Sequence, residues 1–182
     1  MQEIDTVKEL TPFQYEVRVS ALGRLLHRLA HLMAMIGGGI FMLLVIMSVI
    51  SIVGRKLFNW AVPGDMEVMQ MAAAVASASY FAQCHLKSGD VKVDFFTHNL
   101  PVRKAAALDA LGSLLMGFFG ALLAWRTFEG AMVLKEVGET SPILNFPVWI
   151  AQAFMVPGFI ALSAIGFFMC MNLLEQALGE NQ

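Results

Sequence analysis

Charged residues are scarce in this sequence. Asp, Glu, Lys and Arg together make up 14% of its 182 residues, whereas 58% of the residues are hydrophobic. Typical soluble domains have about 25% charged and about 45–50% apolar residues. A soluble fold of this size would be unable to bury so many apolar side chains, because much of its surface must face water. The composition therefore excludes an ordinary soluble domain and predicts an integral membrane protein.

The sequence also lacks the patterns of several functional classes. Its two cysteines, Cys84 and Cys170, form no CxxC pair, so we interpret both as small buried hydrophobic residues with free thiols. No dense Lys/Arg run is present, which argues against a nucleic-acid partner. An HExxH motif, a nucleophile elbow and a glycine-rich phosphate loop are all missing. We therefore predict that the protein is not an enzyme.

Histidines offer no convincing haem site. A haem inside a membrane protein needs paired histidines that face each other from neighbouring helices. The histidines here fall in predicted connectors or at predicted helix ends, so we expect no bound cofactor. They are His27, His31, His85 and His98.

Four apolar runs are long enough to cross a bilayer core, which takes about 20 residues as a helix. Because lipid offers the backbone no hydrogen-bond partners, each run is expected to be helical. The fold class is thus an all-α membrane protein with four transmembrane helices. The expected spans are about 29–53, 66–84, 105–125 and 146–173. They form one membrane domain over residues 20–175, which is flanked by an N-terminal segment 1–19 and a tail 176–182.

Lys and Arg counts predict the orientation. The side holding the opening segment, the connector after the second span and the tail carries eight basic residues, and the other side carries four, including Arg126 and Lys135 in the third connector. Since cytoplasmic loops are enriched in Lys and Arg, both termini are predicted to be cytoplasmic. The third helix is expected to run past the membrane, because no breaker occurs before Gly138.

The segment before the first span is amphipathic. Between Ser20 and Met33, leucines and Met33 share one arc of a helical wheel, and polar or basic residues take the opposite arc. Two alternatives stay open: an interfacial helix lying on the inner membrane face, or a plain cytoplasmic extension of the first span.

Polar groups within the spans are few, and small residues are common. Glu67 lies in the first turn of the second span, where the helix dipole favours a carboxylate. We interpret it as a structural or subunit-contact residue, with ion or proton transport as the alternative. Small residues at three- and four-residue spacing allow close helix packing in lipid. The predicted packing positions are Ala73, Ser77, Gly117, Ala121 and Gly158.

Four features in order resemble one known family. Arg55-Lys56 follow the first span, Glu67 opens the second, DVKVDFFTHNLP follows the second, and TSPILNFPVW precedes the fourth. Over about residues 20–175 the chain resembles the DctQ-type small membrane subunit of tripartite ATP-independent periplasmic (TRAP) transporters. Two positions depart from the family pattern. Asp90 replaces the usual histidine, and Lys92 replaces an arginine, which turns any bidentate contact there into a point charge.

The resemblance implies partners rather than a substrate site. A large many-span subunit in the bacterial inner membrane would carry an organic acid anion with sodium in an elevator motion. A periplasmic binding protein would deliver the anion to it. The small subunit would brace that scaffold. Residues implied at subunit or lipid contacts are Arg55, Lys56, Glu67, Asp90, Lys92, Asp94 and Trp149. The chain is expected to be a separate subunit rather than part of a fusion.

Two other functions remain as alternatives. A haem- or quinone-associated membrane anchor of a respiratory enzyme can share the four-span size. A small self-sufficient exporter is less favoured, because the first span has no acid at its middle. The charged stretch from His85 to Lys104 is either a solvated cytoplasmic turn or a segment that pairs with the large subunit or lipid headgroups.

Overall fold

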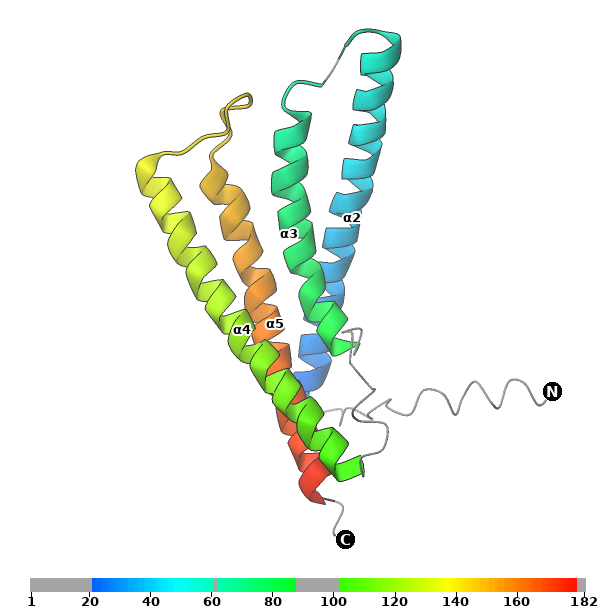
Figure 1. Ribbon diagram of the computed structural model, residues 1–182, viewed down its shortest axis with the longest axis vertical. Coiled ribbons are helices and arrows are strands. Elements are labelled where there is room, and N and C mark those ends of the chain that lie inside the picture. The colour runs from blue at the N-terminus through cyan, green and yellow to red at the C-terminus, as the bar shows by residue number, and fades with distance from the viewer. Residues whose placement is uncertain (1–20, 61, 88–101, 180–182) are drawn as a thin grey trace, which may run out of the picture.

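The computed structural model describes residues 21–60, 62–87 and 102–179, which form four long helices (Figure 1). They are α2 (Ala21–Leu57), α3 (Asp65–Leu86), α4 (Val102–Val137) and α5 (Val148–Gly179). The turn between α2 and α3 and the loop between α4 and α5 lie at the same end of the molecule, the upper end in Figure 1. The expectation of an all-helical protein is confirmed.

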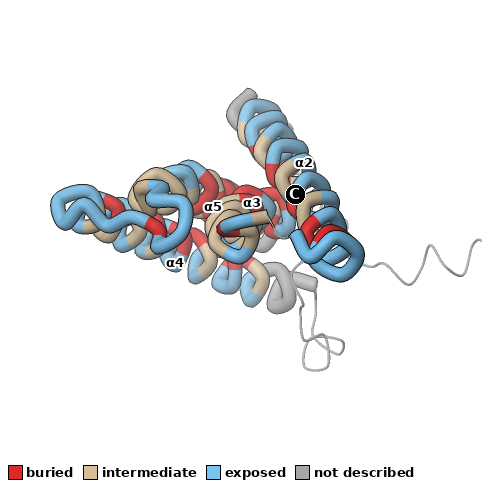
Figure 2. The backbone as a smooth tube through the Cα atoms, turned by 90° about the horizontal axis from the view of Figure 1, so that it is seen from above, coloured by how far each residue is buried: buried red, intermediate tan, exposed pale blue. Residues whose placement is uncertain are grey.

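The four helices form a row instead of a closed bundle. Seen from above, the order is α4, α5, α3, α2 (Figure 2). Helix α3 packs against α2 on one side and α5 on the other, whereas α4 packs against α5 alone among the described helices. Helices α2 and α5 meet where Ala30 joins a buried cluster with Ala82, Ile165 and Met169. A single layer leaves both broad faces uncovered by the rest of the described residues.

Glycines mark the closest helix contacts. A Cβ atom on Gly158 would lie 2.5 Å from the carbonyl oxygen of Ala78, and one on Gly166 would lie 2.6 Å from the Cα of Gly117. Backbones approach this closely only where a side chain is missing, which is how small residues strengthen helix packing in lipid.

The predicted packing positions have different surroundings. Gly117 and Gly158 are buried at the α4–α5 and α5–α3 contacts, respectively. Ala73 and Ser77 on α3 are half-buried. Ala121 on α4 is exposed in the isolated chain.

Three helices are long and apolar enough to cross a membrane: α2, α4 and α5. Helix α3 is not among them, because its 22 residues are rich in alanine and include Asp65, Glu67 and two glutamines. Its central place in the row gives a physical reason, since neighbours on two sides reduce the surface that lipid can reach. The fourth span and the orientation stay predictions.

The segment before the first span is continuous with it. Residues 21 to 57 form one helix without a break, so within these residues the amphipathic segment is an extension of α2 and not a separate helix. The sequence from Arg24 to Ile36 contains no glycine or proline that would end the helix. One side of this stretch packs on α5, where the Phe168 ring lies against Gly23.

Helix α4 ends where the sequence predicts. Gly138 adopts a φ of 69°, a left-handed conformation that glycine tolerates without strain. The Glu139 N–H donates to the Leu134 carbonyl at 3.2 Å, which satisfies one of the last carbonyls of the helix. Helix α4 therefore continues past residue 125 as predicted, whereas the place where it leaves the membrane stays a prediction. The predicted role of Pro101 in opening α4 lies outside the described residues.

Candidate functional site

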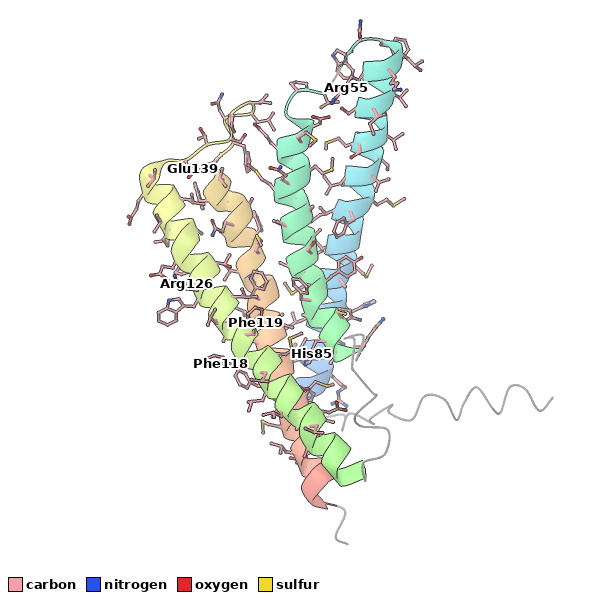
Figure 3. All side chains as sticks on the ribbon, in the orientation of Figure 1. Arg55, His85, Phe118, Phe119, Arg126 and Glu139 are labelled. Atoms are coloured by element: carbon pink, nitrogen blue, oxygen red, sulfur yellow. The ribbon has the colours of Figure 1, made fainter. Side chains whose placement is uncertain are left out.

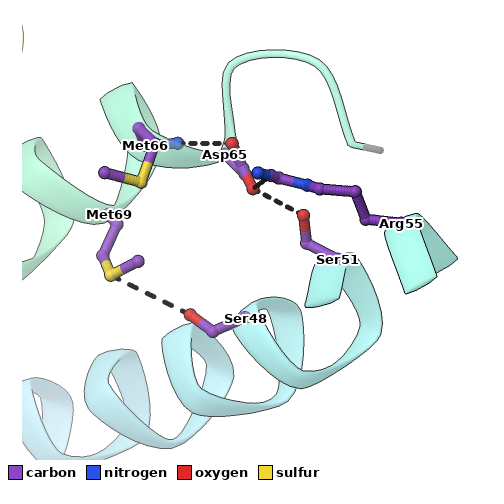
Figure 4. Close-up of polar contacts among 6 residues, drawn as sticks. All are labelled: Ser48, Ser51, Arg55, Asp65, Met66 and Met69. Carbon is purple, nitrogen blue, oxygen red and sulfur yellow. Dashed lines mark hydrogen bonds and ion pairs between the residues drawn. The ribbon is translucent and has the colours of Figure 1, made fainter. Parts of the chain in front are cut away.

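A carboxylate joins the first two helices at the upper end. Asp65, the first residue of α3, accepts hydrogen bonds from the Ser51 hydroxyl at 2.5 Å and from the Arg55 guanidinium at 2.9 Å (Figure 4). Its other oxygen accepts from the Met66 N–H at 2.9 Å. Ser51 and Arg55 lie one turn apart on α2, so the Asp65 side chain alone can bind both of them and hold α2 against the start of α3.

These donors stabilise the charged form of Asp65. The Ser51 hydroxyl contributes most to lowering the pKa of this carboxyl below its ordinary value of 3.8; the Met66 N–H and the Arg55 guanidinium act in the same direction, and partial desolvation opposes them. Ser51 itself is almost fully buried, at 1% exposure. The bond to Asp65 therefore satisfies a hydroxyl that is out of reach of water.

A second carboxylate holds the loop between α4 and α5. Glu67 accepts from the Ser141 hydroxyl at 2.5 Å, from the Ile143 N–H at 2.9 Å and from the Leu144 N–H at 3.2 Å. Both of its oxygens are engaged, and the donors come from residues more than 70 positions away in the chain. Glu67 thus fastens the first turn of α3 to a loop that follows α4.

The loop has an internal structure of its own. The Ser141 N–H donates to the Phe146 carbonyl, and the Val148 N–H donates to the Glu139 carbonyl, which makes a narrow antiparallel turn. Asn145 adopts a φ of 52° within it. The Leu144 side chain lies over Gly64, where a Cβ atom would come within 2.6 Å of Leu144 Cγ. The loop therefore also rests on the turn that precedes α3.

An open cleft of about 510 Å³ lies beside this loop. Residues of α3 and α5 and the loop line it, and Thr127 lines it from α4. Its polar groups include Gln70, Thr127 and Gln152, and its apolar part includes Met71 and Met155. Among the described residues, no group of three or more His, Cys, Asp or Glu side chains could hold a metal ion. The arrangement suits a structural contact better than bond-making chemistry.

The other predicted contact residues fall in different places. Lys56 is exposed beside the Arg55–Asp65 ion pair. Trp149 is half-buried at the start of α5, with the Lys135 ammonium 5.3 Å from its ring centroid. Asp90, Lys92 and Asp94 lie outside the described residues, as does His98.

The remaining titratable candidates lie far from the carboxylates. His27 and His31 are exposed on α2, and His85 is buried near the lower end of α3, where Figure 3 labels it. Cys84 is exposed and Cys170 is buried, and the two thiols are free.

Sequence reasoning found Glu67 but missed Asp65 and the partners of both carboxylates. Glu67 was predicted as a contact residue, and the loop sequence TSPILNFPVW was singled out without a link between them. The structure brings these two motifs together through Ser141. Ser51 and Asp65 were missed as a pair, although a serine one turn before an arginine, facing an acid across a short turn, is a detectable signal.

Comparison with known proteins gives one match. A family model described as "Tripartite ATP-independent periplasmic transporters, DctQ component" matches residues 43–180. The matched region includes both carboxylates, the loop that Glu67 holds and the whole of α3, α4 and α5. No curated protein and no solved structure matches the chain.

Proposed function

The chain belongs to the DctQ component family of TRAP transporters, and from this premise we propose that it braces the large membrane subunit of such a transporter. Membership makes it a multi-pass membrane component of a non-enzymatic, tripartite system, which implies other transporter components. It also decides against the respiratory anchor and the self-sufficient exporter.

The observation that carries the proposal is the single-layer row of helices. A closed bundle buries most of its own contacts, whereas this row leaves large apolar side chains exposed on all four helices. Such a slab is suited to covering the flank of a larger membrane protein. In an elevator, the moving domain needs a fixed partner, and a wider fixed scaffold resists tilting in the bilayer.

The two carboxylate contacts support the same role. Asp65 links α2 to α3, and Glu67 links α3 to the loop before α5. Both contacts stiffen the upper end, which is the periplasmic end in the orientation predicted from Lys and Arg counts. On this proposal the large subunit imports an organic acid anion with sodium, and a periplasmic binding protein delivers it. Lipids cover the remaining surface, and the complex lies in the bacterial inner membrane with both ends of this chain cytoplasmic.

Uptake by reconstituted complexes tests the proposal. Sodium-driven uptake in proteoliposomes should disappear when this chain is left out, while the large subunit still folds. Lys92→Ala, Asp94→Ala and Glu67→Ala should lower uptake by weakening assembly, with the apparent substrate affinity of the surviving complexes unchanged. Asp90 belongs to the same proposed contact. Full uptake by the large subunit alone would contradict the bracing role, and transport by this chain alone would contradict the proposal as a whole.

A further inference from the structure

Helix α4 carries an ion pair on the surface that the other helices leave uncovered. The Arg126 guanidinium donates to the Glu129 carboxylate at 2.9 Å, one helical turn apart. The two side chains are 73% and 54% exposed. Figure 3 shows Arg126 on the side of α4 that faces away from the rest of the row. Since α4 packs on α5 alone among the described helices, the pair has no cover from this chain.

Helix contacts fix the level of this pair along α5. A Cβ atom on Gly120 would touch the backbone of Ser163, and one on Gly130 would touch the Gln152 side chain. Arg126 lies between these two contacts, so the antiparallel register places it beside Pro157. In the sequence analysis, Arg126 counts with the third connector, just past the predicted span 105–125 and within the expected extension of that helix; the structure has Arg126 inside α4.

The same level can be followed across the row to α2. Gly158 packs on the backbone of Ala78 in α3, and Gly37 of α2 packs on Ala76 and Ser79 of the same helix. Gly37 lies inside the stretch Leu29–Val53, which contains no Asp, Glu, Lys or Arg. At about 1.5 Å per residue, this stretch continues from Gly37 for roughly 12 Å towards Leu29 at its lower end and for roughly 24 Å towards Val53 at its upper end.

The level of Arg126 also lies inside an uncharged stretch of helix α5. Its stretch from Val148 to Leu174 also contains no charged residue. Pro157 lies nine residues from the upper end of that stretch and 17 residues from the lower end, as counted along the sequence. On both α5 and α2, the level of Arg126 therefore falls inside the uncharged stretch.

Charged side chains at such a level almost always avoid lipid in membrane proteins. They face a protein interior or a water-filled cavity, because lipid offers no hydrogen bonds to an ion. Arg126 has five N–H donors, and Glu129 is its recorded partner among the described residues. The guanidinium therefore has donors left over for acceptors other than the described residues.

The opposite edge of the row differs. Apart from His31 and Gly39, the exposed residues of α2 within its uncharged stretch have large apolar side chains, among them Met42, Leu43 and Val45. Lipid alone satisfies such a surface. The α4 edge combines large apolar side chains with the ion pair; we call its exposed residues Leu115, Phe118, Leu122, Arg126, Glu129 and Val133 the α4 outer face.

We propose that the α4 outer face is the docking surface for the large membrane subunit, which presents hydrogen-bond acceptors to Arg126 within the membrane. The inference rests on the proposed function and adds the face, the depth and the chemistry of the contact. The α2 edge faces lipid.

Photo-crosslinking in the assembled transporter tests which edge is covered. A benzophenone amino acid replaces Phe118 on α4 in one version and Met42 on α2 in the other, and each is co-expressed with the large subunit. We expect a crosslink to the large subunit from position 118 and none from position 42. A crosslink from position 42 alone would overturn the inference while leaving the proposed function intact. Crosslinks from position 118 to lipid alone, or to a second copy of this chain, would also overturn it.

Two double variants test the chemistry. In Arg126→Leu/Glu129→Leu the ion pair is removed, and in Arg126→Glu/Glu129→Arg it is reversed but kept. Loss of a polar contact between membrane helices lowers their association constant roughly three- to thirty-fold. We therefore expect the amount of large subunit that co-purifies to fall by that factor in both double variants. The thermal stability of this chain alone should not fall in either, which separates docking from folding.

The outcomes distinguish the two proposals. If the face contacts lipid, the leucine variant should raise co-purification or leave it unchanged, and the reversed pair should behave like the wild type. Either result, with the wild-type complex intact, would overturn the inference only. Failure of the wild-type chain to co-purify with the large subunit would overturn the proposed function and this inference with it.

Discussion

Adding one methyl group at Gly158 should loosen the row at its centre. Its Cβ would lie 2.5 Å from the Ala78 carbonyl oxygen and 2.7 Å from the Ala78 carbonyl carbon, whereas ordinary contact begins at 3.4 Å. Helices α3 and α5 would therefore have to separate by about 0.9 Å at this point. Both neighbouring atoms belong to the backbone, so no side chain can rotate to make room.

The expected magnitude follows from two opposing effects. Overpacking a close contact costs about 1–3 kcal/mol, and replacing a helical glycine by alanine returns about 0.5–1 kcal/mol. Gly158→Ala should then lose about 1–2 kcal/mol of unfolding free energy, or ~2–8 °C in melting temperature for a chain of this size. Gly112→Ala is the matched control, because a Cβ atom there meets nothing within 4 Å. It should gain ~1–4 °C through helix propensity alone.

The buried thiol of Cys170 provides the assay. It is 6% exposed and packs with Ala110 and Leu173, so a thiol-reactive fluorescent dye should label it only as the helices separate. Cys84→Ser removes the exposed thiol from the background. The two variants are heated as isolated chains in detergent, and the melting temperatures are compared. Equal melting temperatures, or a more stable Gly158→Ala, would refute the close-packing argument at the α3–α5 contact.

Three further predictions concern the ends of the helices. Glu67→Gln should raise the proteolysis rate of the loop before α5, because an amide cannot accept all three hydrogen bonds. The control Glu136→Gln changes an exposed carboxylate and should leave this rate unchanged. Equal proteolysis rates in the two variants would contradict the role of the Glu67 contact. The depressed pKa of Asp65 stabilises the fold above pH 3.8, and this contribution should be lost as the pH falls through the lower folded-state pKa. The melting temperatures of the wild type and of Asp65→Asn should thus differ at neutral pH and converge in acid. A difference that stays constant with pH would be contrary evidence. A cysteine at Asn59 should react with an impermeant reagent from the periplasm and one at Ser88 should not, whereas the reverse pattern would invert the orientation.

The sequence by itself determined the class of the protein, the family and the approximate extent of each helix. Composition and long apolar runs carry this information because a bilayer forces the backbone into helices, whatever their neighbours are. The end of α4 was predictable for a local reason as well, since Gly138 is the residue that adopts the left-handed conformation there. The family match covers residues 43–180 and agrees with the resemblance carried by the two motifs at Glu67 and TSPILNFPVW.

Only the tertiary structure decided which helix lies beside which. Small residues predict close contacts without naming a partner, because any glycine stripe fits any other; hence Gly158 could be predicted as a packing residue but its contact with Ala78 could not. The same holds for the hydrogen bonds from Ser141 to Glu67 and from Ser51 to Asp65, which depend on the register of helices distant in sequence or joined by a turn. It holds above all for Arg126. The predicted span ended one residue before it, and only the register of α4 against α5 shows that it lies level with Pro157, within the uncharged stretch of α5.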